Sequence, residues 1–239
     1  MIFSILKSIT GFLLKRKHLI SNNMNSFYIL SILYAIFLTL SMITSYRFIN
    51  MLNISTSATC IFFIGICFVI VNIVTENYNS TYAKRMIFIT ISAIGIGMFI
   101  LAITNLISAP VGKEKYENAY AIVLKNEFTH VYLFNALAAL IGFNSTSSLL
   151  FFLRKINTPI ILRILIADFL GEFLFTFTVI SLIMIPIGET WQVIISMTIT
   201  SFIIKLIFSL ICSTIILPIS EKVILWFDGS KYQPCFMEK

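Results

Sequence analysis

Charged residues are scarce in this chain of 239 residues. Asp, Glu, Lys and Arg make up 11% of the sequence, whereas hydrophobic residues make up 59% and Phe occurs 23 times. A soluble domain is about one quarter charged and about one half apolar. The composition therefore predicts a polytopic membrane protein that has lipid as the solvent for most of its length. In a soluble protein the net charge of +7 would indicate nucleic-acid binding. In a membrane protein the distribution of basic residues instead indicates the topology, so we expect no direct nucleic-acid partner.

The sequence also lacks the motifs of metal sites, disulfide frameworks and common catalytic centres. It has four Cys and two His, and no pair of them has metal-ligand spacing. Cys60, Cys67 and Cys212 fall in apolar runs, where a Cys usually acts as a small hydrophobe. There is no Gly-rich phosphate loop, no paired His and no Asp-rich head-group motif. We therefore expect no cofactor, no metal and no enzymatic activity.

Long hydrophobic runs are what the chain does have, and we count six. Each is close to the ~20 residues that span a bilayer, and a helix satisfies its own backbone hydrogen bonds within lipid. The chain length favours one bundle over two domains. We predict an all-α protein with six transmembrane helices, at about 27–46, 58–74, 86–108, 131–153, 160–185 and 192–217.

Basic residues are concentrated on one side of this predicted bundle. The side that holds both termini carries most of them, including Lys15, Arg16, Lys17, Lys84, Arg85, Arg154, Lys155 and Arg163. The longest loop on the opposite side, 109–130, balances three Lys with three Glu. Because Lys and Arg accumulate on the cytoplasmic side, both termini are predicted to be cytoplasmic.

The same pattern divides the chain into three segments. Residues 1–26 are an apolar stretch closed by basic residues, which predicts an amphipathic cytoplasmic segment at the membrane surface; a poorly ordered tail is the alternative. Residues 27–227 form the six-helix transmembrane domain, and 228–239 form a cytoplasmic tail. Within the loop 109–130, residues 116–128 are rich in helix formers. They predict either a short surface helix or a solvated connector.

Two acidic residues interrupt the fifth hydrophobic run. Asp168 and Glu172 are four residues apart and share one helix face, and they lie about 12 Å and about 18 Å from the cytoplasmic end. A charge at the bilayer centre costs about 3 kcal/mol on insertion scales, so these side chains must face protein or water. Gly171 between them allows close approach of a helix or a ligand. Lys205 in the sixth run has a similar depth, so we expect it to meet Glu172 near the midplane.

Further polar residues lie at related depths. Asn72 and Glu76 share a face of the second predicted helix, and Asn144 lies in the fourth beside a Ser/Thr run. A cavity lined by the second, fourth, fifth and sixth helices would accommodate them. The candidate substrate-binding residues are therefore Glu172, Asp168, Asn72, Glu76, Asn144 and Lys205. The alternative is structural: an ion pair of Lys205 with the two acids, one of them protonated, and Asn and Ser as interhelical hydrogen bonds.

Three segments carry a resemblance to a known family. They are VNIVTENYN at 71–79 followed by Lys84 and Arg85, Arg163 with IADFLGEFLFT at 166–176, and Lys205 with Leu217-Pro218. These are similar to TDIITEVYG, STLVGQLIDT and a late lysine-containing helix of the queuosine precursor transporter family, also called the vitamin uptake transporter family. The order and spacing fit from about residue 27 to residue 227. Four positions depart from the family pattern: Asn72 replaces an Asp, Glu172 a Gln, Phe175 an Asp and Asn79 a Gly.

The resemblance implies a multi-pass permease of the bacterial inner membrane. It implies uptake of a small purine-like substrate, a 7-deazaguanine precursor of queuosine or queuine itself, for tRNA modification. A carboxylate accepts two parallel hydrogen bonds from the ring N–H and exocyclic amine of such a base, while Lys205 or an Asn donates to its carbonyl. We expect Glu172 to be this carboxylate and aromatic rings to cover the base. Which base is carried, which ion is coupled and whether the chain forms a homo-oligomer stay open.

Two other functions are compatible with the composition. One is the substrate-binding subunit of an ATPase-driven, energy-coupling vitamin uptake complex. Small residues four apart on the first helix would favour it, and here that spacing holds only Ala35 and Thr39. The other is a membrane-embedded enzyme, which the missing catalytic motifs argue against.

Overall fold

The computed structural model describes residues 19–21, 25–44, 48–51, 54–57, 62–104, 127–228 and 232–234. Most of the predicted amphipathic segment at 1–26, most of the loop at 109–130 with its predicted short helix, and nearly all of the tail after residue 228 lie outside these ranges. The predictions made for those segments therefore stay predictions.

The described residues form six helices, as the six hydrophobic runs predict. They are α2 (Asn25–Ile43), α4 (Phe63–Tyr78), α5 (Ser80–Thr104), α7 (Glu127–Lys155), α8 (Ile160–Ile187) and α9 (Trp191–Asp228). Each of these helices except α4 is long and apolar enough to cross a membrane. The 16-residue helix α4 is shorter than a usual span.

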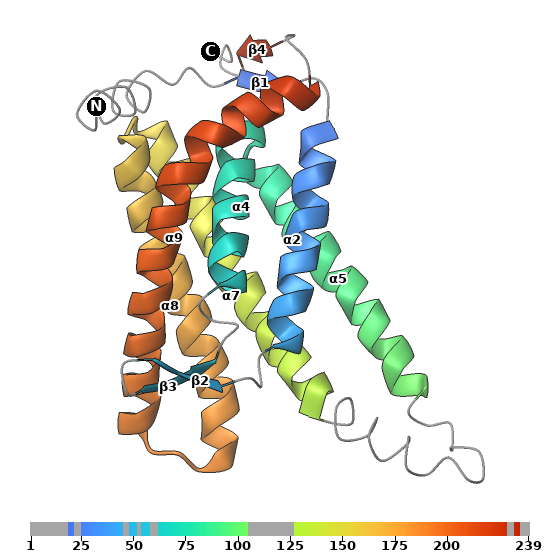
Figure 1. Ribbon diagram of the computed structural model, residues 1–239, viewed down its shortest axis with the longest axis vertical. Coiled ribbons are helices and arrows are strands. Elements are labelled where there is room, and N and C mark those ends of the chain that lie inside the picture. The colour runs from blue at the N-terminus through green and yellow to red at the C-terminus, as the bar shows by residue number, and fades with distance from the viewer. Residues whose placement is uncertain are drawn as a thin grey trace.

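Helix α4 lies in the middle of the bundle (Figure 1) and contacts the other five helices. Nearly every residue along it is buried, from Ile64 to Tyr78. A helix that is apolar around its whole circumference belongs in a core, and α4 is covered by its neighbours rather than by lipid. This position explains how a short helix can be accommodated in a membrane domain.

The bounds of α4 differ from the predicted helix at 58–74. A short antiparallel hairpin, β2 (Phe48–Met51) with β3 (Ile54–Ser57), precedes the helix and includes β-branched residues that favour strands. At the other end the helix continues to Tyr78 because its polar residues are buried against neighbouring helices instead of leaving the membrane. Helix α5 then starts at Ser80 after the single residue Asn79, which has a φ of 103°.

A second small ladder pairs a segment near the start of the chain with a segment near its end. Strand β1 (Leu19–Ser21) pairs antiparallel with β4 (Tyr232–Pro234), at the end of the bundle where α4 turns into α5 (Figure 1). The two ladders add strand to an otherwise helical fold. The segments next to both termini therefore lie at the same end of the bundle, as the topology prediction requires. That this end faces the cytoplasm stays a prediction.

Helix α9 has an apolar outer face and a polar inner face. Every fourth residue on one face is an exposed Ile, and every third or fourth residue on the other is a buried polar residue. The exposed set is Ile195, Ile199, Ile203, Ile207, Ile211 and Ile215, and the buried set is Thr198, Ser201, Lys205, Ser209 and Ser213. This arrangement is the reverse of a soluble protein and suits a helix between lipid and a polar interior.

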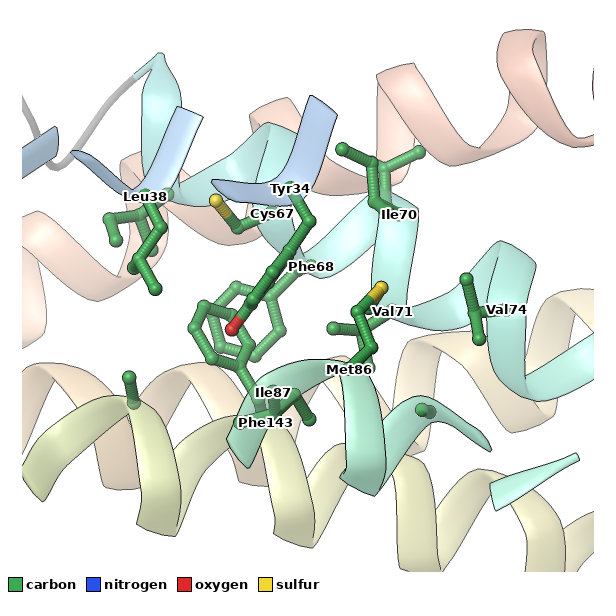
Figure 2. Packing of buried hydrophobic residues seen from close by; sticks show 14 of the residues in the cluster. Tyr34, Leu38, Cys67, Phe68, Ile70, Val71, Val74, Met86, Ile87 and Phe143 are labelled. Carbon is green, nitrogen blue, oxygen red and sulfur yellow. The ribbon is translucent and has the colours of Figure 1, made fainter. Parts of the chain in front are cut away.

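The core of the bundle contains a cluster of aromatic rings from four helices. Tyr34 of α2 lies over Phe143 of α7 with ring centroids 5.6 Å apart, and Phe68 of α4 is 4.5 Å from the same ring (Figure 2). Phe175 of α8 completes the cluster at 5.7 Å from Phe143. All four side chains are almost completely buried, so the cluster fixes the positions of α2, α4, α7 and α8 around the polar residues of α8.

Candidate functional site

Asp168 of α8 is bonded to two other helices in the interior of the bundle. Its Oδ1 and Oδ2 accept hydrogen bonds from Asn72 Nδ2 of α4, at 2.9 and 3.0 Å, and Oδ2 also accepts from Ser209 Oγ of α9 at 2.8 Å. All three side chains are inaccessible to solvent. Hydrogen bonds to a charged acceptor are stronger than neutral ones, so Asp168 joins α4, α8 and α9 through a well-satisfied carboxylate.

Glu172 lies one helical turn further along α8 and has the opposite environment. Its side chain is also 0% exposed, but neither of its carboxyl oxygens has a hydrogen-bond partner among the described residues. Burial of a polar group without a partner is costly, and such groups in native proteins are exceptional. Glu172 therefore presents two unused oxygens toward the interior of the bundle.

Lys205 of α9 contacts α8 close to Glu172 without bonding to it. Its Nζ donates to Thr176 Oγ1 at 2.9 Å and lies 4.9 Å from the centroid of the Phe175 ring. The sequence predicts that Lys205 meets Glu172, and the structure places the Lys205 ammonium on Thr176, one helical turn beyond Glu172. The structural alternative of an ion pair is not formed, because the lysine chain reaches the hydroxyl one turn beyond Glu172.

Helices α7 and α8 approach each other closely at the level of these acids. A Cβ atom on Gly142 of α7 would lie 2.8 Å from the carbonyl oxygen of Gly171, and a Cβ on Gly171 would lie 2.9 Å from the carbonyl oxygen of Gly142. Thr146 Oγ1 fills the space beside Gly171 and donates to Gly142 O at 3.2 Å. The close approach predicted at Gly171 is thus an approach of two helix backbones, which leaves the acid-bearing face of α8 toward α4 and α9.

A second polar cluster lies one turn away, where α4 ends and α8 begins. Arg163 Nη2 forms an ion pair with Glu76 Oε2 at 2.7 Å, and Arg154 Nη1 donates to the carbonyl oxygens of Thr75 and Glu76 at 3.3 and 3.1 Å. Both arginines and Glu76 are buried. A cation at a helix C-terminus is favourable. Glu76 is therefore paired with Arg163 and belongs to this second cluster, separate from Asp168 and Glu172.

Asn144 is the candidate residue that the structure leaves apart from the others. It is half-buried, and its Nδ2 donates to Leu140 O of its own helix at 2.7 Å. The neighbouring Ser147 instead connects helices, since its hydroxyl lies 3.0 Å from those of Thr75 and Ser80. At Ser147 these contacts agree with the predicted role of the Ser/Thr run in hydrogen bonds between helices.

Sequence reasoning missed three residues that complete the environment of the acids. Ser209 binds Asp168, Thr176 binds Lys205, and Phe175 lies under the lysine ammonium. Their signal in the sequence is periodic: Ser209 follows Lys205 by four residues, and Thr176 follows Glu172 by four. Over the ranges that the structure describes, no group of three or more His, Cys, Asp or Glu side chains could hold a metal ion.

Comparison with known proteins bears on the whole of this region. A family model described as "Putative vitamin uptake transporter" matches residues 56–219, from the last two residues of β3 through most of α9. The match includes every residue of both polar clusters. No curated protein and no solved structure gave a match. The matched segment covers more than half of the chain and coincides with membrane-spanning helices. The chain therefore belongs to this vitamin uptake transporter family and is a multi-pass membrane transporter.

Proposed function

We propose that the protein is a permease of the bacterial inner membrane that takes up a 7-deazaguanine base, a precursor of queuosine or queuine, for tRNA modification. The observation that carries the proposal is the pair of unused oxygens on Glu172, fully buried on an inner helix face. Such a group is expensive to maintain in a membrane domain. A substrate that forms hydrogen bonds with these two oxygens would offset the cost of burying Glu172.

The edge of a guanine-like base has the complementary chemistry. It carries a ring N–H and an exocyclic amine next to a ring carbonyl, so a carboxyl group can form two parallel hydrogen bonds with it. Asn72 Oδ1 is a further buried acceptor without a partner among the described residues. Glu172 and Asn72 together offer three unused polar atoms that fit one edge of a single base.

The other residues near Glu172 suit a flat, polar aromatic substrate. Phe175 and Phe143 belong to the aromatic cluster beside the acids, and aromatic rings favour offset or edge contacts with another ring. Lys205 has donors beyond the one it gives to Thr176, and they are available to a ring carbonyl. A movement of α8 and α9 relative to α4 would open the site to one side of the membrane at a time, as in alternating access.

The test is restoration of queuosine in tRNA. A bacterial strain that lacks its own precursor synthesis and transporter is complemented with the parent chain, with Glu172→Ala and with Glu189→Ala, and is fed queuine, the aminomethyl base or the cyano base separately. Glu189 is an exposed carboxylate outside the cluster and serves as the matched control. Membrane abundance of each variant is measured by immunoblot.

We expect the parent and Glu189→Ala to restore queuosine with at least one base, and Glu172→Ala to restore none at equal abundance. Failure of the parent with all three bases would reject this substrate class. Full activity of Glu172→Ala would reject the site while leaving the substrate in place.

A further inference from the structure

We propose that Glu172 binds a proton together with the base, so that the permease imports one proton with each base. This inference rests on the proposed function for the identity of the base, and it adds the ion that is coupled to uptake. It follows from the different hydrogen-bonding of two acids on one helix face and from the charge balance around them.

The hydrogen bonds separate the two acids into a charged and a neutral one. Asp168 accepts from Asn72 and Ser209, and a carboxylate needs donors of this kind. Glu172 has no hydrogen-bond partner among the described residues: the Ser209 hydroxyl is close enough to act on it, but its single proton is donated to Asp168 Oδ2 at 2.8 Å. An ion without donors or a bonded counter-ion is the costliest group to bury. Asp168 is therefore the ionised acid, and Glu172 carries a proton.

The charges from the helices around Glu172 support the same assignment. Helix α9 contributes Lys205, and α8 itself contributes Asp168; these two are the charged groups that act on Glu172. On α4 and α7 the buried charges are Glu76 and Arg154, which lie in the second cluster with Arg163 of α8. The positive charge of Lys205 balances one negative charge. With Asp168 ionised, a protonated Glu172 makes the interior around it neutral.

A protonated Glu172 also fits the base better than a carboxylate does. A neutral carboxylic acid has one donor and one acceptor, which match the adjacent carbonyl and ring N–H of the base. The exocyclic amine of the base can then donate to Asn72 Oδ1, which has no partner among the described residues. All three unused atoms receive partners and no unbalanced charge is created.

The consequence is symport, because the proton that Glu172 takes up from outside crosses the membrane with the base. With the proton and base bound, the site is neutral and fully hydrogen-bonded. After the base leaves to the cytoplasm, water in the open site solvates Glu172, so the charged form is no longer disfavoured by burial, and the proton leaves to the side of lower proton activity. The empty site then returns with Glu172 ionised near Lys205, and a proton from outside loads it again before the next base binds. A gradient that is acidic outside then drives accumulation of the base. The proton is only bound and released, and no bond of the base is made or broken.

The proton on Glu172 is tested first without any base. Infrared spectroscopy of the parent protein in lipid near pH 7 should show the carbonyl stretch of a buried protonated carboxylic acid. This band should disappear in Glu172→Gln and persist in Glu189→Gln, because Glu189 is an exposed acid outside the cluster. Absence of the band in the parent, or its survival in Glu172→Gln, would overturn the proposal.

Coupling is tested in proteoliposomes with the membrane potential clamped by potassium and valinomycin. An inside-alkaline gradient of about one pH unit should give about tenfold accumulation of the base by the parent, since one unit is tenfold in proton activity. Glu172→Gln should still exchange labelled for unlabelled base, because the amide keeps a donor and an acceptor, but it should not accumulate base with the gradient. A sodium gradient should have no effect on either.

The outcomes of the two experiments separate this inference from the proposed function. Exchange by the parent with no response to the pH gradient, accumulation by Glu172→Gln, or accumulation driven by sodium would each overturn proton coupling while supporting base transport. Failure of the parent to exchange any deazaguanine base would reject the proposed substrate, and the infrared band would then still decide whether Glu172 holds a proton.

Discussion

Asn72 and Asp168 are 96 positions apart in the sequence, and the amide nitrogen of Asn72 bonds to both carboxylate oxygens of Asp168, at 2.9 and 3.0 Å. The pair joins the central helix α4 to the acid-bearing helix α8. It also orients the Asn72 side chain so that its own oxygen stays without a partner among the described residues. One bond pattern therefore stabilises the bundle and creates an acceptor beside Glu172.

Replacement of Asn72 should both destabilise the bundle and reduce transport. Asn72→Ala leaves Asp168 with Ser209 as its donor, and loss of a hydrogen bond to a buried charge costs about 1.5–3 kcal/mol. Denaturant unfolding in detergent micelles measures this change in unfolding free energy. Asn144→Ala is the matched control, because that amide donates within its own helix, and we expect a loss of about 1 kcal/mol or less. Equal losses in the two variants would contradict the role given to Asn72.

The ion pair between Arg163 and Glu76 should show strong energetic coupling. Either Arg163→Gln or Glu76→Gln alone leaves a buried charge without its counter-ion, which costs about 3–5 kcal/mol. The double variant removes both charges and should lose much less than the sum of the two single losses. A double-mutant cycle on unfolding free energy measures the coupling. Additivity within about 0.5 kcal/mol would show that the pair does not act as a unit.

Substitution by alanine should have opposite effects on stability at two glycines, Gly171 and Gly97. A Cβ on Gly171 would collide with Thr146 and with the backbone of Gly142, so Gly171→Ala should force α7 and α8 apart and cost about 1–3 kcal/mol. Gly97 of α5 has no atom within 4 Å of the position of a Cβ. Gly97→Ala should therefore stabilise its helix by up to about 1 kcal/mol. Thermal unfolding of both variants in the same detergent makes the comparison, and similar Tm values would refute it.

The one-residue turn between α4 and α5 should be stabilised by glycine. Asn79 has φ 103° and ψ 157°, a region that is essentially restricted to glycine and costs other residues about 1–3 kcal/mol. Asn79→Gly relieves this strain but loses the side-chain oxygen that accepts from Ser80 N, so we expect a net gain of about 1 kcal/mol in unfolding free energy.

Asn157 is the control for this substitution. Its φ is 58°, a left-handed conformation that Asn tolerates well, and Asn157→Gly should change stability by a smaller amount. Asn79→Ala should be destabilising, since alanine keeps the strain and removes the acceptor. A gain for Asn79→Ala, measured in the same unfolding assay, would show that the turn is not strained.

The sequence predicted the positions of the helices better than the contacts between them. Hydrophobic runs located all six helices because a membrane helix must satisfy its backbone and its surroundings along its own length. The end of α4 was predicted at residue 74 and lies at Tyr78, because its last polar residues are buried against neighbouring helices, and that burial depends on the tertiary packing. Asp168, Glu172 and Lys205 were found because buried charge is rare in lipid. Ser209 and Thr176 were missed because Ser and Thr are common in membrane helices.

The sequence by itself determined that this is a helical membrane protein with two acids and one lysine in its interior, since composition and spacing fix hydrophobicity and helix face. The tertiary structure alone decided how these groups are paired. It gave Asp168 its donors from Asn72 and Ser209, gave Lys205 to Thr176, and left both oxygens of Glu172 without a partner among the described residues. A hydrogen bond between helices depends on their distance and rotation to within a few tenths of an ångström, and packing sets those quantities.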